Sequence, residues 1–173
     1  MPELRKDPII DRWVIIAKER AKRPITSTVP PPKKAVGFCP LCPCNEEKTA
    51  VPVYTDWSPQ SNFTETTWRL RVVQNKFPAL VNEGVLQPQS EGFYEWMDGV
   101  GAHEVIVETP DHYATWADFD DTQAACVLDG YRQRILALNR DLRFRYILVF
   151  KNHGADAGAS LDHPHSQIIA LPI

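Results

Sequence analysis

Short apolar stretches bounded by turn residues predict that much of the chain forms β-strands. Residues 68–73 alternate between apolar and polar positions, and residues 11–17 are rich in β-branched side chains. The predicted strands lie at residues 11–17, 68–73, 103–108, 146–151 and 166–171. The last two are separated by a loop at residues 152–162 that is rich in glycine and alanine.

One segment, from Asp120 to Arg140, has the period of a helix that packs on one side. Asp120 or Asp121 can cap its first turn, because a carboxylate accepts hydrogen bonds from the unpaired backbone N–H groups there. Its apolar residues recur at Ala125, Val127, Leu128, Tyr131, Ile135, Leu136 and Leu138. One long helix among several strands predicts an α+β fold, a largely antiparallel sheet with the helix packed on it.

The N-terminal third of the chain has a different character. Residues 24–32 are rich in proline, which excludes a regular helix or a central strand and predicts an extended arm. Residues 45–62 are polar and turn-prone. We therefore expect one domain over residues 1–173, with an arm and cysteine knuckle over about residues 1–62 and a sheet-and-helix core over about residues 63–173.

Composition excludes several classes of protein. The 173 residues are 43% hydrophobic and 24% charged, as in an ordinary soluble globular protein. The formal net charge of −3 gives no indication of nucleic-acid binding. No apolar run approaches the ~20 residues that span a bilayer, and the first residues lack the apolar core of a signal peptide. We expect a cytoplasmic protein without membrane contact.

Three of the four cysteines, Cys39, Cys42 and Cys44, lie within six positions. Such crowding favours metal binding over a disulfide framework in a chain without an export signal. Cys39 and Cys42 form a CxxC knuckle, and zinc prefers four nitrogen or sulfur ligands in a tetrahedron. Cys126 lies alone in the predicted helix and is expected to be a small core residue. The remaining ligands should come mainly from the histidines, and Cys44 is an alternative ligand.

Two of the five histidines, His103 and His112, lie at either end of a predicted strand. The nine residues that separate them span roughly 30 Å when extended, so one ion does not bind both. His112 follows Pro110 and Asp111 at a turn, which can direct its side chain back towards the knuckle. His103 is expected to be a strand-edge residue.

His163, Pro164, His165, Ser166 and Gln167 immediately precede or begin the last predicted strand. The proline fixes its own backbone and holds the preceding residue extended, so the two histidines are held stiffly. Residues two apart in an extended segment share a face, which places both histidines on the side of Gln167. The small residues at 154–160 allow backbone N–H groups to approach a phosphate.

Three interpretations of the histidine pair compete. Both rings can be ordinary hydrogen-bonded histidines, or both can bind one catalytic zinc whose water attacks the substrate. In the third, one histidine binds a structural zinc and the other is a nucleophile towards phosphorus. Gln167 would then donate a hydrogen bond to the phosphoryl oxygen.

Five motifs in order decide between these interpretations. They comprise residues 11–16 with 20–24, residues 39–49, residues 75–80, residues 108–112 and residues 152–167. Together they resemble the galactose-1-phosphate uridylyltransferases, a branch of the histidine-triad superfamily, over nearly the whole chain. The resemblance implies a histidine-triad-like half-barrel with a zinc-bearing N-terminal arm. It also implies the N-terminal half of a longer enzyme, whose C-terminal half is absent here and which is a homodimer at full length.

The resemblance also implies the chemistry. His165 would attack the α-phosphorus of a nucleotide-sugar, form a nucleotidyl-histidine and release a sugar 1-phosphate. A second sugar 1-phosphate would then take the nucleotide, as in a UDP-glucose:hexose-1-phosphate uridylyltransferase of galactose metabolism. The resemblance further implies that Gln167 and Ser160 contact the phosphoryl oxygens and that Arg20 and Arg23 lie near the phosphates. Asn75 and Phe77 would bind the nucleoside, and Asn152 and Gly158 would shape the loop. The implied zinc ligands are Cys39, Cys42, His112 and His163.

Two positions depart from the family pattern. Ser166 occurs where the uridylyltransferases commonly have glycine, and it is more like the adenylyl-transferring relatives such as ADP-glucose phosphorylase. Cys44 occupies another usual glycine position and is a possible competitor for the metal. The alternatives are therefore an ADP-glucose phosphorylase-like adenylyltransferase, a histidine-triad nucleotide hydrolase, or a non-catalytic module that binds zinc and nucleotides.

Overall fold

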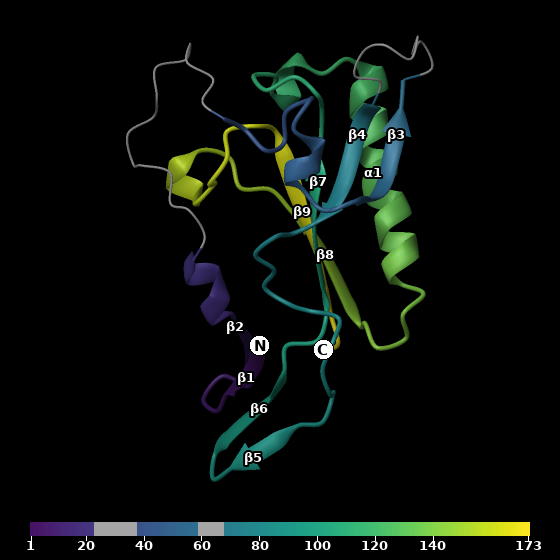
Figure 1. The fold of residues 1–173 in the computed structure, drawn as a ribbon. Coiled ribbons are helices and arrows are strands. Elements are labelled where there is room, and N and C mark those ends of the chain that lie inside the picture. The colour runs from purple at the N-terminus through teal and green to yellow at the C-terminus, as the bar shows by residue number, and fades with distance from the viewer. Residues whose placement is uncertain (23–37, 59–67) are drawn as a thin grey trace.

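The computed structural model describes residues 1–22, 38–58 and 68–173 and consists of two antiparallel sheets and one long helix (Figure 1). The large sheet has five strands in the order β3-β4-β7-β9-β8, and every neighbouring pair is antiparallel. Its strands are β3 (Pro52–Trp57), β4 (Trp68–Gln74), β7 (Ala102–Val107), β9 (His165–Leu171) and β8 (Tyr146–Phe150).

A second, four-stranded sheet lies beside the chain termini, at the bottom of Figure 1. Its strands, in spatial order, are β2 (Arg12–Ile16), β1 (Glu3–Asp7), β6 (Tyr94–Asp98) and β5 (Gln89–Glu91). The N-terminal strands thus pair with a hairpin that lies between β4 and β7 in the sequence. Short 3-10 turns occur at Lys18–Lys22, Glu46–Lys48, Trp116–Asp118 and Ala155–Ala157.

The helix α1 (Asp121–Leu138) begins where the sequence predicts. Asp120 caps it, since its carboxylate accepts a hydrogen bond from the backbone N–H of Gln123 at 2.7 Å. At the other end the Asn139 N–H still donates to the carbonyl of Ile135, so the last turn is closed. Within the described residues, no helix combines the length and apolar character needed to cross a membrane.

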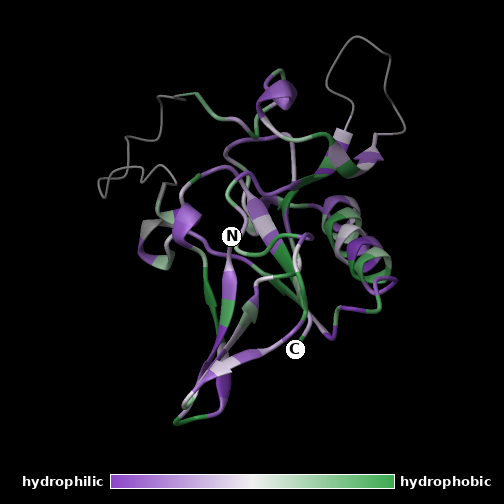
Figure 2. Cartoon of the chain, turned by 60° about the horizontal axis from the view of Figure 1, so that its bottom comes forward, coloured by the Kyte–Doolittle hydropathy of each residue, from purple (hydrophilic) through white to green (hydrophobic). Residues whose placement is uncertain are grey.

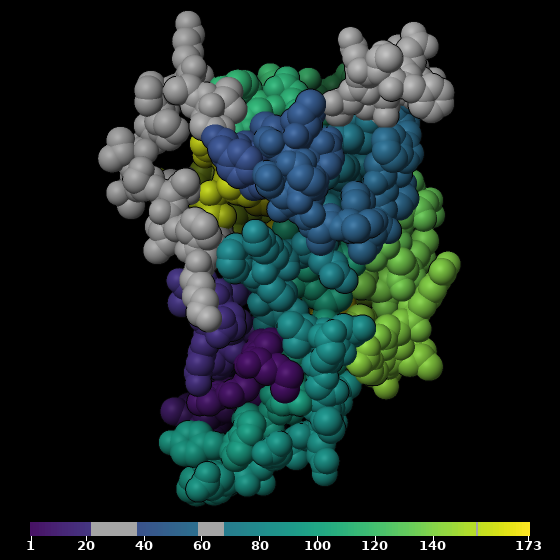
Figure 3. Space-filling view, viewed as in Figure 1, coloured from purple at the N-terminus to yellow at the C-terminus, as the bar shows by residue number. Residues whose placement is uncertain are grey.

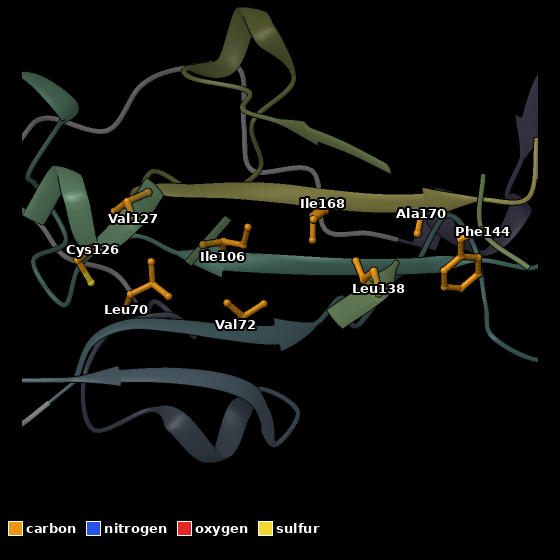
Figure 4. Packing of buried hydrophobic residues seen from close by; sticks show 9 residues of the cluster. All are labelled: Leu70, Val72, Ile106, Cys126, Val127, Leu138, Phe144, Ile168 and Ala170. Carbon is orange, nitrogen blue, oxygen red and sulfur yellow. The ribbon is translucent and has the colours of Figure 1, made fainter. Parts of the chain in front are cut away.

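One face of the large sheet packs against α1 and forms the main core (Figure 4). Alternate strand residues point to this face, as the two-residue period requires. The buried members are Leu70, Val72, Ile106, Cys126, Val127, Leu138, Phe144, Ile168 and Ala170. Cys126 is therefore a core residue, as predicted, and burial raises the pKa of its thiol to about 11.

The opposite face of the large sheet has two separate apolar covers. The first contains Cys39 and Leu41 of the knuckle, which pack on Trp68 and Val107. The second contains Leu4, Leu80, Met97 and Leu171, which join the small sheet to the end of β9. The space-filling view shows the knuckle above and the small sheet below (Figure 3). Apolar residues concentrate in the central strands, whereas α1 carries both apolar and polar residues (Figure 2).

The expected α+β arrangement and all five predicted strands are present. The expectation that residues 45–62 are only polar and turn-prone is wrong, because β3 occupies Pro52–Trp57. This strand lies at the sheet edge and exposes Val53 and Trp57, so its apolar residues do not mark a buried face. The short strands β1, β5 and β6 were not predicted either; β5 is fully exposed and carries no apolar residue.

Candidate functional site

Four side chains of the types that can bind a metal ion meet where the knuckle touches the large sheet. The ligand atoms of Cys39, Cys42, His112 and His163 all lie within 4.8 Å of one another. The knuckle is a tight turn, in which the Cys42 N–H donates to the Cys39 carbonyl at 3.3 Å. Asn45 also donates to that carbonyl, through Nδ2 at 2.8 Å. Two sulfur and two nitrogen atoms at this spacing can bind one metal ion.

Backbone contacts orient the histidines of this cluster. His163 Nε2 lies 2.8 Å from the carbonyl oxygen of Thr109, so Nε2–H donates and Nδ1 carries the lone pair. That Nδ1 lies 3.5 Å from Cys42 Sγ, and Nδ1 of His112 lies 3.2 Å from the same sulfur. A backbone carbonyl that fixes the tautomer of a ligating histidine is typical of metal sites.

Burial sets the protonation of the cluster. It lowers the pKa of His163 to about 4, so the imidazole is neutral, as a metal ligand must be. Burial, with Cys39 as a further cause, raises the pKa of the Cys42 thiol to about 12. Two neighbouring thiolates therefore need a bound cation to exist near neutral pH.

Cys44 and His165 do not belong to this cluster. Cys44 is exposed and has a positive φ of 67°, which directs the chain out of the knuckle. His165 begins β9, and its Nδ1 lies 2.7 Å from the carbonyl oxygen of His163. The two histidines of the pair are thus held differently, which disfavours an arrangement with both rings on one metal ion.

The ring of His165 is oriented by its own strand. Its Nδ1–H donates to the His163 carbonyl, which leaves the lone pair on Nε2. Lys151 Nζ donates to the backbone carbonyl of His165 at 3.1 Å and fixes the start of β9. An imidazole whose far nitrogen is hydrogen-bonded in this way is a competent nucleophile.

His165 and Gln167 share the face of β9 that is turned away from α1, since Ser166 and Ile168 point to the helix. Gln167 is buried, and its Oε1 lies 2.9 Å from Nε2 of His103. His103, expected at the end of a strand, is the second residue of β7, but its burial was not predicted. It lies on β7, between β4 and β9, and is 5% exposed.

Arg20, Asn75 and Phe77 come together next to His103. The Arg20 guanidinium donates to the Phe77 carbonyl at 2.8 Å and lies 3.3 Å from His103 Nδ1. Asn75 Oδ1 accepts from the Phe77 N–H at 2.9 Å, which makes a tight local turn. Arg23 lies outside the described residues.

The loop between β8 and β9 leaves the sheet at the His165 end, because Phe150 at the end of β8 pairs with Gln167. Gly154 and Gly158 both have positive φ, at 79° and 75°, a conformation that glycine adopts without strain. Asn152 and Ser160 of this loop are half-buried. The structure thus brings the loop to the same end of β9 as His165.

A buried polar cluster that the sequence did not predict lies behind His165. Glu108 is fully buried, accepts from Tyr131 OH at 2.9 Å and pairs with Lys151 Nζ at 2.5 Å. The Ser166 hydroxyl also donates to Glu108 and lies 2.7 Å from Tyr131 OH. Burial, then the nearby carboxylate, raises the pKa of Tyr131. The signal in the sequence was a carboxylate at a helix-facing position of a strand.

Arg71 joins the knuckle to the sheet and was also not predicted. Its guanidinium lies over the Trp68 ring, 4.9 Å from the centroid, and donates to Thr49 Oγ1 at 3.3 Å. Burial lowers its pKa. The only indication in the sequence is an arginine in β4 at a position that faces away from α1.

A cavity of about 350 Å³ opens elsewhere, between the end of α1 and the strands β4 and β7. Asn75 and His103 reach its border, but its walls include Glu104 and Arg134 on the helix side of the sheet. Neither His165 nor Gln167 lines it. The candidate reactive and metal-ligating side chains therefore lie outside this cavity, at the cysteine and histidine cluster and the start of β9.

Known proteins resemble this chain over nearly its whole length. An ADP-glucose phosphorylase of Arabidopsis thaliana is 37% identical over 178 residues, which cover 99% of this chain and 49% of that protein. A galactose-1-phosphate uridylyltransferase of Thermotoga maritima is 30% identical over 173 residues, covering 99% of this chain and 47% of that protein. The chain thus spans about half the length of the relatives it matches.

Solved structures show the same fold. The crystal structure of an ADP-glucose phosphorylase from Arabidopsis thaliana with bound ADP-glucose has a TM-score of 0.65 and 34% identity, covering 100% of this chain and 50% of that chain. A uridylyltransferase mutant has a TM-score of 0.68 and 26% identity, covering 99% and 45%. The expected histidine-triad-type α+β fold is confirmed. Residues 1–173 match the model of the galactose-1-phosphate uridyl transferase N-terminal domain, and the chain belongs to that family.

Proposed function

We propose that this chain provides the nucleotidyl-carrying half of a nucleotidyltransferase and that His165 carries the nucleotide. The observation that supports this most directly is the hydrogen bond of 2.7 Å from His165 Nδ1 to the His163 carbonyl. It leaves the Nε2 lone pair for attack on phosphorus. Family membership and the adjacent Gln167 support the same chemistry.

The reaction proceeds in two displacements. His165 Nε2 forms a bond to the α-phosphorus of a nucleotide-sugar, and the bond from that phosphorus to the bridging oxygen breaks. The sugar 1-phosphate leaves with the bonding electron pair. The ring becomes a nucleotidyl-imidazolium, and its Nδ1–H still donates to the His163 carbonyl, which stabilises the positive charge. An acceptor phosphate then displaces the histidine in the reverse sense.

The remaining site residues bind the substrate in this proposal. The Gln167 amide and the Ser160 hydroxyl donate to the phosphoryl oxygens, where charge increases in the transition state. Arg20 and Arg23 lie near the phosphates, and Asn75 with Phe77 holds the nucleoside. Asn152 and Gly158 give the phosphate loop its shape.

We further propose that Cys39, Cys42, His112 and His163 bind a zinc ion with a structural role. Two thiolates and two imidazoles form a closed ligand set, without an open position for substrate. Zinc bound there would fix the backbone of His163, whose carbonyl orients His165. The chemistry at phosphorus then belongs to the side chains of β9.

Two nucleotide donors are candidates. The family name and the Thermotoga maritima relative suggest a uridylyl group exchanged between UDP-glucose and a hexose 1-phosphate, as in galactose metabolism. The greater identity, 37%, to an ADP-glucose phosphorylase favours an adenylyl group and inorganic phosphate as the acceptor. Both share the covalent step at His165.

The test is the intact-protein mass after zinc-loaded protein is mixed with UDP-glucose or ADP-glucose. A nucleotidyl adduct with one donor, absent in His165→Ala and present in His153→Ala, identifies the mechanism and the base. Its discharge by phosphate or by galactose 1-phosphate then identifies the acceptor. No adduct with either donor would contradict catalysis by this chain and favour a module that only binds zinc and nucleotides.

A further inference from the structure

We propose that His103 is a positioning residue, which fixes the orientation of the Gln167 side-chain amide so that its nitrogen faces the reacting phosphoryl group. The inference deepens the proposed function and rests on it. None of the family motifs identified in the sequence includes His103. It lies on the neighbouring strand β7 and shares the open face of the sheet with Gln167.

The contacts of His103 define its tautomer. The backbone N–H of Ala79 donates to Nδ1 at 2.8 Å, and the Arg20 guanidinium lies 3.3 Å from the same nitrogen. Both groups are donors only, so Nδ1 must be the acceptor. Asn75 Nδ2, a donor, also lies 3.0 Å from Nε2, but a neutral ring whose Nδ1 accepts must carry its proton on Nε2. The Asn75 amide hydrogen is then directed to Gln167 Oε1 rather than to the ring.

This tautomer determines the orientation of Gln167. His103 Nε2–H points at Gln167 Oε1 over 2.9 Å, and Asn75 Nδ2 lies 3.5 Å from the same oxygen. The oxygen thus faces two donors, and the amide nitrogen is turned away from them. Within the described residues, no group accepts a hydrogen bond from that nitrogen. It is the donor left for a substrate oxygen.

The orientation matters because the two ends of a glutamine amide have nearly the same shape. Rotation by half a turn would present Oε1 to a phosphoryl oxygen, and two acceptors repel each other. Loss of a donor to a developing charge slows an enzyme roughly 100- to 1000-fold. Loss of its orientation alone leaves part of the population correct, so the expected effect is smaller.

Single-turnover adduct formation with the reactive donor tests the proposal. His103→Leu, which cannot donate, should react roughly 10- to 100-fold more slowly than the wild type. His103→Gln keeps a donor at a similar reach and should recover part of that loss. In a Gln167→Leu background, His103→Leu should have no further effect, because His103 acts through Gln167. Zinc content and Tm of each variant show that the fold is retained.

Independent losses that multiply in the double variant would overturn the proposal, as would a His103→Leu protein that reacts at the wild-type rate. Imidazole ¹⁵N NMR of the wild-type protein tests it without any reaction. The expected spectrum shows neutral His103 protonated at Nε2, and protonation at Nδ1 would overturn the inference. Absence of an adduct in the wild type, with the expected NMR spectrum, would instead contradict the proposed function alone.

Discussion

His163 and His165 lie two residues apart, yet their rings have different partners. His163 donates through Nε2 to Thr109 and directs Nδ1 to the cysteines, whereas His165 donates through Nδ1 to His163. The same side chain thus presents opposite nitrogens at the two positions. One is suited to bind a metal ion and the other to attack phosphorus.

Replacing the two histidines should therefore have separable effects. His163→Ala or Cys39→Ala should lose zinc and lower Tm, because structural zinc contributes to the free energy of folding. If about 3 kcal/mol of that contribution is lost, Tm falls by roughly 6–12 °C. His165→Ala should retain zinc and nearly the wild-type Tm. Metal analysis and thermal unfolding check both, and zinc loss in His165→Ala would favour the shared catalytic metal.

At this scale the sequence identifies the motif residues but not their partners. The CxxC spacing and the turn at His112 indicated both knuckle cysteines and His112 from local geometry, whereas His163 as a ligand was implied only by the family resemblance. The burial of His103 was not predicted, because local pattern does not give strand order and β7 lies between β4 and β9. Glu108 was missed because its partners come from α1 and β8.

Among the elements, β9 directs alternate side chains to the two faces of the sheet, and the two sets have different roles. His165 and Gln167 point to the open face, while Ser166 points to α1 and Glu108. The serine that distinguishes this chain from the common family pattern is therefore on the far side of the strand from the proposed substrate. It supports the strand and does not face a nucleotide base.

We accordingly predict that Ser166→Gly leaves the choice between uridylyl and adenylyl donors unchanged. It should cost about 1–2 kcal/mol in stability, from the lost hydrogen bond and the glycine in a strand. Adduct formation with each donor, together with denaturant unfolding, provides the measurement. A reversed donor preference would show that position 166 does contribute to specificity.

The buried carboxylate should matter more for stability. Glu108→Ala leaves the Lys151 ammonium without its ion pair and removes one of the two hydrogen-bond partners of Tyr131 OH. Removing one member of such a buried pair costs about 3–5 kcal/mol, and the lower end applies because Lys151 is partly exposed. Denaturant unfolding measures this loss, with the exposed carboxylate variant Glu83→Ala as a control. A loss below that of the control would contradict the assigned role.

The buried side of α1 differs from the one that the apolar pattern predicts. Leu128 and Leu136 were expected on the buried side and are exposed. The buried side instead carries Gln123, which donates to the Glu108 carbonyl, and Arg134, which pairs with Glu104 at 2.8 Å. Periodicity located the helix and its cap. It does not predict which polar residues lie on the buried side, because their hydrogen-bond partners are distant in the sequence.

Replacing Gly130 of the same helix by alanine should lower the free energy of unfolding, although alanine has the higher helix propensity. A methyl group there would lie 2.9 Å and 3.0 Å from the two terminal carbons of Leu70, which is fully buried. Gly130→Ala should therefore lower stability by about 1 kcal/mol. In a Leu70→Ala background the clash is gone, and the same change should add about 1 kcal/mol. Equal effects in both backgrounds would contradict this packing.

At the scale of the whole molecule, the proposed site forms where two covers meet the open face of one sheet. The knuckle contributes the metal-binding cysteines, and the segment after β2 contributes Arg20. Both come from the N-terminal part of the chain, whereas His165 comes from its end. The sequence predicted the fold class from its strands and helix, but the pairing of β1 with β6 depends on contacts that no local pattern records.

In the proposed function, this assembly makes His165 a covalent carrier of a nucleotide. The most direct measurement is peptide mass mapping of the zinc-loaded protein after reaction with UDP-glucose or ADP-glucose, under conditions that preserve phosphoramidate bonds. We expect one nucleotidyl group, located on His165 and absent after His165→Ala. A nucleotidyl group on another residue, or one that persists in His165→Ala, would contradict it.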